Sequence, residues 1–64
     1  MNENMKILIV DDSALMRNFA KGSLKQLKLN NVGEAEDGEK ALLELKKEKY
    51  DLILSDLHMP NMDG

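Results

Sequence analysis

The most constraining feature of this sequence is a pair of short, continuous apolar runs, each followed closely by aspartate. The first run covers residues 7–10 and leads into Asp11 and Asp12, and the second covers residues 52–54 and leads to Asp56. Runs of this length without polar alternation are typical of strands that are buried on both faces, as in a parallel sheet covered by helices. We therefore expect the chain to fold around two such strands.

The segments between the two runs have the spacing of amphipathic helices. Residues 13–28 carry apolar side chains at the i, i+1, i+4 and i+5 positions, and the basic residues take the other side. The expected apolar face of this first helix consists of Leu15, Met16, Phe19, Ala20, Leu24 and Leu27. We expect Asp12 or Ser13 to cap its start.

The second expected helix covers residues 38–49, with Ala41, Leu42 and Leu45 as its apolar face. Asp37 is its expected N-cap, and lysines crowd its end, where the helix dipole favours positive charge. Between the two helices, residues 31–37 are too polar for a central strand and suit the edge of a sheet.

The expected order of elements is therefore βαβαβ, an α/β fold. Parallel strands joined by helical crossovers give the strand order 2-1-3 of a flavodoxin-like, doubly wound sheet. The apolar third strand then has no outer neighbour within residues 1–64. We expect these residues to be the N-terminal half of such a domain, truncated after the third-strand loop.

Length and composition limit how such a fold can be stabilised. Sixty-four residues make one domain at most, near the small end of the range that folds alone. The absence of cysteine excludes a disulfide and fits a reducing cytoplasm, and a single histidine cannot build a zinc site unaided. Oligomerisation is the remaining means of stabilising so small a domain.

The charge pattern argues against two classes of partner. Nine basic and twelve acidic residues give a net charge of −3, and the lysines stand among glutamates rather than in a basic block. No apolar run approaches the ~20 residues of a membrane span. We expect neither nucleic acid nor a membrane as a partner.

Three aspartates follow strands whose carboxyl ends meet at the expected switch point of the sheet, where such folds bind ligands. Asp11, Asp12 and Asp56 would repel one another there unless a cation joined them. Oxygen ligands of this kind suit Mg2+ in octahedral geometry. The alternative interpretation is that these aspartates are only helix caps, which often follow strands.

The segments "ILIVDD", "NVGEAEDGEKAL" and "DLILSDLHMPNMDG" together resemble a response-regulator receiver domain of two-component signalling, of the chemotaxis (CheY-like) type. The resemblance covers the whole chain but corresponds to about the first half of the family's domain. It implies that Asp56 accepts a phosphoryl group from a sensor histidine kinase. It implies a phosphoacceptor that catalyses its own phosphorylation rather than an enzyme.

The resemblance also implies a ligand set for Mg2+. Asp12 corresponds to the direct carboxylate ligand, Asp11 acts more through bound water, and Asp56 completes the acidic group. The backbone carbonyl of His58 is the further implied ligand, so its imidazole is not. The Ser or Thr and the Lys with which the family grips the phosphoryl group lie on its fourth and fifth strands and are not among residues 1–64.

Other classes fit less well. A phosphatase of the haloacid dehalogenase type requires D-x-D, whereas Asp56 is followed by Leu57 and His58. An EF-hand loop requires alternating acidic ligands, which the residues before "NMDG" lack. A nucleotide-binding fold requires a glycine-rich first turn, whereas this chain has "DDSA" there. The remaining alternative is a structural or engineered half-domain that self-associates without signalling. Pairing of two third strands would give a homodimeric sheet of order 2-1-3-3′-1′-2′.

Overall fold

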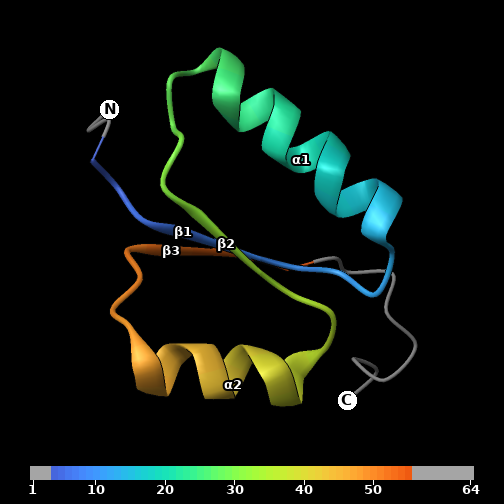
Figure 1. The fold of residues 1–64 in the computed structure, drawn as a ribbon, viewed down its shortest axis with the longest axis vertical. Helices are drawn as coiled ribbons and strands as arrows, with labels where there is room; N and C mark the ends of the chain where they lie inside the picture. Colours follow the sequence, from blue (N-terminus) through green and yellow to red (C-terminus); the bar gives the residue numbers. More distant parts are fainter. Residues whose placement is uncertain (1–3, 56–64) are drawn as a thin grey trace.

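The structure is a computed structural model that describes residues 4–55 (Figure 1). Its elements are β1 (Ile7–Val10), α1 (Ala14–Gln26), β2 (Val32–Ala35), α2 (Gly38–Lys47) and β3 (Leu52–Ser55). The predicted order βαβαβ is confirmed.

The three strands form one parallel sheet in the order β2-β1-β3. The central strand β1 pairs with both neighbours in a shared register, so that Val10 lies opposite Ala35 on one side and Ser55 on the other. This is the predicted 2-1-3 arrangement, with β2 at an edge. Because the strands are parallel, their carboxyl ends lie at the same edge of the sheet.

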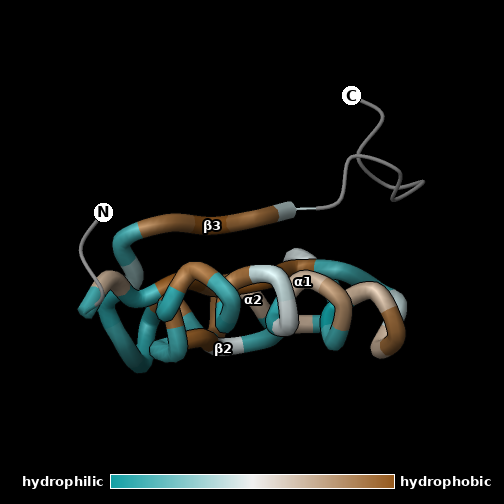
Figure 2. Tube along the Cα trace, turned by 90° about the horizontal axis from the view of Figure 1, so that it is seen from above, coloured by the Kyte–Doolittle hydropathy of each residue, from teal (hydrophilic) through white to brown (hydrophobic). Residues whose placement is uncertain are grey.

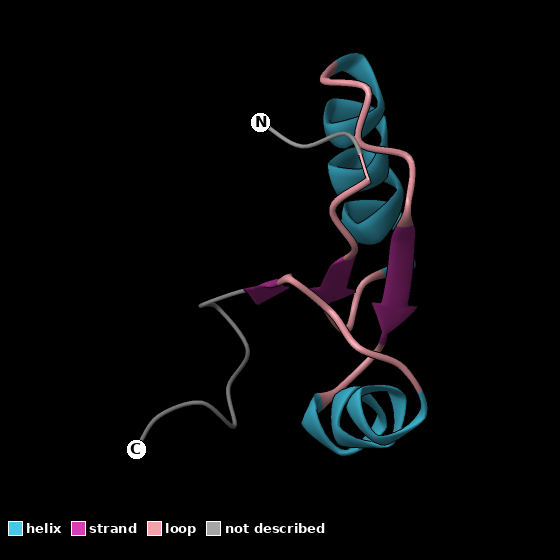
Figure 3. Cartoon of the chain, turned by 90° about the vertical axis from the view of Figure 1, so that its left-hand side faces the viewer, coloured by secondary structure: helices cyan, strands magenta, loops and turns pink. Residues whose placement is uncertain are grey.

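The two helices cover opposite faces of the sheet, α1 on one side and α2 on the other (Figures 1 and 3). The side chains of β1 alternate between these faces: Ile7 and Ile9 pack with Leu24 of α1, whereas Leu8 and Val10 pack in a second cluster with Ala41 of α2. All four β1 side chains are buried. The continuous apolar run of β1 is thus explained by burial on both faces.

Local hydrogen bonds define the ends of α1. Ser13 is the N-cap, and its Oγ accepts a hydrogen bond from the Met16 amide at 3.3 Å. At the other end, the Leu29 amide donates to the Leu24 carbonyl at 2.9 Å across Lys28, whose φ of 64° lies in the left-handed region. Leu24 and Leu29 also pack together in the core, so this turn is a Schellman motif with its apolar contact.

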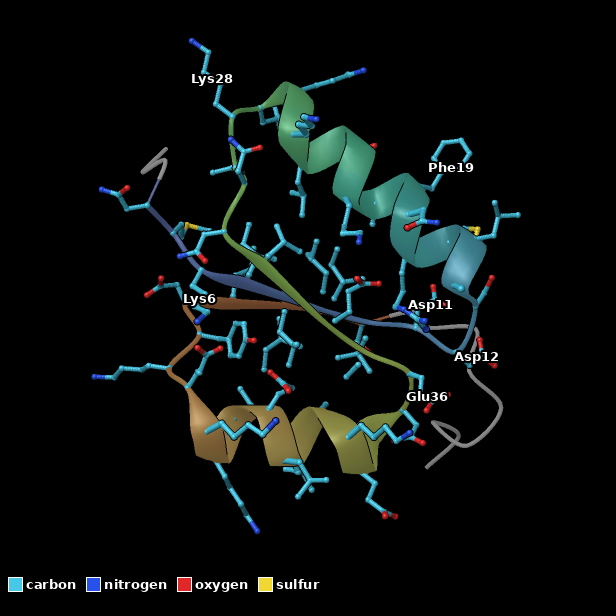
Figure 4. All side chains as sticks on the ribbon, in the orientation of Figure 1. Lys6, Asp11, Asp12, Phe19, Lys28 and Glu36 are labelled. Atoms are coloured by element: carbon cyan, nitrogen blue, oxygen red, sulfur yellow. The ribbon has the colours of Figure 1, made fainter. Side chains whose placement is uncertain are left out.

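The predicted apolar face of α1 is only partly confirmed. Leu24 is buried and Ala20 partly buried. The other four residues are exposed: Leu15, Met16, Phe19 and Leu27. The prediction that one face buries all six residues is wrong. Arg17 and Lys21 turn toward the sheet instead and bind Glu34 of β2. The apolar side chains on the adjacent face of α1 then point away from the sheet, as Phe19 does in Figure 4.

The N-cap of α2 agrees with prediction, whereas the helix ends at Lys47 instead of residue 49 and its apolar face differs from the predicted one. Asp37 is the N-cap, and its Oδ1 accepts from the Lys40 amide at 2.8 Å. Of the predicted face, Ala41 is buried, whereas Leu42 and Leu45 are exposed. Only the side chain nearest the sheet is covered, because α2 has no second helix beside it among residues 4–55. In the same part of the chain, neither helix is long and apolar enough to cross a membrane.

The strand β3 has the composition of an interior strand but the environment of an edge strand. Its apolar residues Leu52, Ile53 and Leu54 are 39%, 47% and 37% exposed, as expected for a third strand without an outer neighbour among the described residues. Both helices contact β1, and α2 also contacts β2. Figure 2 shows the apolar β3 lying to one side, apart from both helices and from β2. Pairing with β1 therefore satisfies one side of the β3 backbone, and the faces of β3 remain accessible.

Candidate functional site

The candidate site lies at the carboxyl end of β1. The Asp11 amide donates to the Ala35 carbonyl at 3.0 Å, which continues the β1–β2 pairing by one residue beyond the strand. Asp12 follows at the turn into α1, and Figure 4 places Asp11, Asp12 and Glu36 at this same edge of the sheet. Asp11 and Asp12 thus follow the carboxyl end of β1, the edge at which parallel sheets present ligands, and their role as metal ligands stays a prediction.

The two aspartates have different surroundings. Asp11 is 8% exposed, and its Oδ1 accepts a hydrogen bond from the Ser13 amide at 2.9 Å. Its Oδ2 accepts no hydrogen bond from residues 4–55. Asp12 is exposed and makes no hydrogen bond with the described residues. Consecutive residues thus present one carboxylate that is hydrogen-bonded and one that is exposed.

Arg17 connects this acidic pair to the rest of the fold. Its Nη1 donates to the backbone carbonyl of Asp11 at 2.6 Å, and its Nε donates to Oε1 of Glu34 at 2.9 Å. The Arg17 side chain is only 18% exposed. One guanidinium therefore joins the end of β1, the first turns of α1 and the edge strand β2.

Glu34 is held by two cations of α1. Lys21 donates from Nζ to Oε2 at 2.7 Å, and Arg17 binds the other carboxylate oxygen. The hydrogen bond from Lys21, together with that from Arg17 and the charges of both, lowers the pKa of Glu34 against the opposing effect of partial burial. Glu34 therefore stays ionised and balances one of the two positive charges beside the acidic pair.

The donor set that the structure describes suits a hard, oxygen-seeking cation. Mg2+ is commonly held by one or two carboxylates and keeps several of its waters. The carboxylates of Asp11 and Asp12 match this pattern. Within residues 4–55, no group of three acidic or histidine side chains could hold a metal. The other predicted site residues, Asp56 and the backbone carbonyl of His58, lie outside the described residues.

The sequence-based assignment missed Arg17, which was placed on the solvent side of the first helix. One pattern could have identified it. Arg17 lies four residues after the N-cap Ser13, and helical side chains lean toward the helix N-terminus. A long basic side chain at that position reaches back over the residues that enter the helix, which here are the acidic pair.

A surface groove of about 680 Å3 runs from Arg17 along the edge strand β2 and α2. Its glutamates are already paired: Glu34 with Arg17 and Lys21, Glu36 with Lys40, and Glu44 with Lys47. The groove therefore offers no free carboxylate among these residues, and the acidic pair does not line it. We place the candidate site at the end of β1 rather than in this groove.

Comparison with known proteins agrees with the geometry of this edge. Residues 7–64 match the response regulator receiver domain family. The chain is 50% identical over 64 residues to chemotaxis protein CheY-3 from two strains of Vibrio cholerae serotype O1, covering all of this chain and 49% of each relative. It is 40% identical over 62 residues to the gliding motility regulatory protein of Myxococcus xanthus, covering 97% of this chain and 8% of that protein. The chain spans about half the length of the CheY-3 relatives and belongs to the response regulator receiver domain family.

Proposed function

We propose that this chain acts in a two-component phosphorelay, accepting a phosphoryl group on Asp56 from the phosphohistidine of a sensor histidine kinase in the cytoplasm. The observation that carries the proposal is the register of the sheet, in which Val10 pairs with Ser55. In the sequence, Asp11 directly follows Val10 and Asp56 directly follows Ser55. Membership of the receiver family supports the same assignment.

In the proposed reaction, a carboxylate oxygen of Asp56 forms a bond to phosphorus. The bond from phosphorus to the kinase imidazole nitrogen breaks, and the imidazole keeps the electron pair. Asp56 thereby becomes an acyl phosphate. The chain is consumed and regenerated as a phosphoacceptor, so it is not an enzyme that acts on a separate substrate.

Asp11 and Asp12 would hold Mg2+ beside this reaction, with Asp56 and the His58 carbonyl as further oxygen donors. When bound, the cation neutralises charge on the transferred phosphoryl oxygens. The protein prepares the site by fixing the Asp11 carboxylate through the hydrogen bond that the Ser13 amide donates to Oδ1. Asp12 adds a second negative charge at the surface.

The test is phosphorylation of the chain by acetyl phosphate with Mg2+, followed by intact mass measurement. We expect a mass gain of one phosphoryl group that is lost on chelation of Mg2+ and in Asp56→Asn. Asp51→Asn is the matched control, because Asp51 lies just before the amino end of β3 and its amide oxygen can still accept from the Lys6 amide. Incorporation that survives in Asp56→Asn, or none in the folded wild-type chain, would contradict the proposal.

A second candidate function is self-association through β3, favoured by the exposure of Leu52, Ile53 and Leu54 on a strand that pairs on one side only within residues 4–55. Such an edge offers both unpaired backbone groups and apolar side chains to another chain. Pairing of two β3 strands by a two-fold axis would give a homodimer with the strand order 2-1-3-3′-1′-2′.

Light scattering distinguishes this candidate. We expect a dimer at micromolar concentration that Ile53→Lys dissociates, since a charge at the centre of β3 would be buried against the partner copy. Leu43→Lys is the control, because Leu43 is equally apolar and exposed but lies in the groove beside β2. A folded wild-type monomer at micromolar concentration would rule this candidate out.

A further inference from the structure

We propose that Arg17 is a positioning residue that holds the acidic pair in the geometry needed to bind a divalent cation; the inference rests on the cation site of the proposed function. Arg17 does not touch the cation in this proposal. It acts through the Asp11 carbonyl, which accepts its Nη1–H at 2.6 Å, and through Glu34, which accepts its Nε–H at 2.9 Å.

Arg17 binds the peptide group between the two aspartates. The Asp11 carbonyl that it holds belongs to the planar unit that also contains the amide nitrogen and Cα of Asp12. Fixing the direction of this carbonyl therefore fixes where Asp12 leaves the strand. Asp12 is exposed and has no side-chain hydrogen bond within the described residues, so its backbone is the part of it that the fold can hold.

Glu34 in turn holds the guanidinium of Arg17 in place. A planar guanidinium presents several donors in a fixed arrangement, so one bond to Glu34 restricts the direction of the other to Asp11. Lys21 binds the second oxygen of Glu34, and Glu34 stands on β2 opposite Ile9 of the central strand. The Asp11 carbonyl is thus tied to the sheet by a chain of charge-assisted hydrogen bonds.

The hydrogen bonds of Arg17 and its positive charge have opposite expected effects on Mg2+ affinity. A cation beside the acidic pair repels Mg2+, so an Arg17 that acted only through its charge would weaken metal binding, and its removal would tighten it. Positioning predicts the opposite sign, because loss of the hydrogen bonds frees the Asp11–Asp12 peptide. Arg17→Lys keeps the charge and loses the planar arrangement of donors, and Arg17→Gln removes both.

The experiment is a Mg2+ titration of the 64-residue chain, followed by the NMR shifts of the Asp11, Asp12 and Ser13 amides. We expect both Arg17 variants to bind Mg2+ roughly 10-fold more weakly, the low end of the effect of losing a residue that orients a metal ligand. Lys25→Gln is the matched control: it removes one positive charge from the last turn of the same helix, but its side chain forms no hydrogen bond with Glu34 or Asp11, and we expect its affinity within about twofold of wild type.

Circular dichroism and urea unfolding establish that each variant is folded, and Arg17→Lys carries the test if Arg17→Gln is not. Wild-type affinity in both Arg17 variants, or tighter binding by Arg17→Gln, would overturn the positioning role. In that case a loss of binding in Asp12→Asn would leave the cation site itself standing. A wild-type chain that binds no Mg2+ would instead show that the cation site of the proposed function is wrong, and the role of Arg17 with it.

Discussion

The side chain of Tyr50 lies directly against the backbone of Gly33, so that a Cβ added at Gly33 would overlap the tyrosine hydroxyl and lie 3.0 Å from Cζ. The ring cannot easily move aside. Its hydroxyl donates to Glu44 at 3.0 Å, and the Lys6 ammonium lies 5.1 Å from the ring centroid. This contact closes the end of the sheet opposite the acidic pair, and it explains why a glycine interrupts β2.

Replacement of Gly33 by alanine is therefore expected to lower the free energy of unfolding by about 1–3 kcal/mol, the usual cost of overpacking. Urea unfolding measures it. The same substitution in a Tyr50→Phe background removes the atom that overlaps most, so the penalty there should be smaller. An equal penalty in both backgrounds would show that Tyr50 is not its cause.

Gly22 is the opposite case. It lies within α1, is exposed, and an added Cβ would meet nothing within 4 Å. Because glycine loses more backbone freedom than alanine on entering a helix, Gly22→Ala is expected to raise the free energy of unfolding by about 0.5–1 kcal/mol. Urea unfolding under the same conditions as for Gly33→Ala checks this, and a loss of stability would contradict it.

Lys28 occupies a backbone conformation that favours glycine. Its φ of 64° places it in the left-handed region, at the turn that ends α1. Because the lysine side chain is exposed and its Cβ is disfavoured there, Lys28→Gly is expected to raise the free energy of unfolding by about 1 kcal/mol. Lys25→Gly, within the same helix, is the control and should lower it. If neither substitution, or both, raised the free energy of unfolding, the assignment of Lys28 to a position that favours glycine would be contradicted.

The hydroxyl of Tyr50 is expected to titrate at high pH. Burial, the hydrogen bond to Glu44 and nearby negative charge raise its pKa from 10.0 to about 12. The chain has one tyrosine, so its ultraviolet absorbance reports this group alone. Glu44→Gln should lower the midpoint without restoring 10.0, because burial is the largest cause. Since the unfolded chain loses the proton first, stability should fall as the pH rises above 10.

Glu34 is expected to make the free energy of unfolding fall as the pH is lowered, whereas Tyr50 makes it fall as the pH is raised. The hydrogen bond from Lys21 and the interaction with Arg17 lower its pKa below 4.5 in the folded chain. This contribution is present above pH 4.5 and is lost as the pH falls through the lowered pKa, where the folded carboxylate takes up its proton.

Urea unfolding across this pH range measures that loss. Glu34→Gln should show a smaller fall in stability than wild type. Glu39→Gln is the control, since Glu39 lies in the first turn of α2 and forms no ion pair with the described residues. An identical fall in wild type and Glu34→Gln would contradict the prediction.

Much of this architecture follows from local pattern. The continuous apolar run of β1, the caps Ser13 and Asp37, and the polar edge strand β2 are each specified by a few neighbouring residues, and the structure contains all of them. The positions of Asp11 and Asp12 at the end of β1 follow in the same way. The assignments to Asp56 and His58 stay predictions, because these residues lie outside the described part of the chain.

Long-range contacts decided the rest. Helical periodicity states which side chains share a face, but not what that face meets, so the exposure of Phe19 on α1 and of Ile53 on β3 depends on where each element lies in the layers. The bonds of Arg17 to Asp11 and Glu34 join residues that are 6 and 17 positions apart.

The sequence by itself determined the elements, their order and the acidic pair, because hydrogen bonding and burial of short segments are local. The tertiary structure alone decided which side chains hold that pair in place, because only folding brings β1, α1 and β2 together.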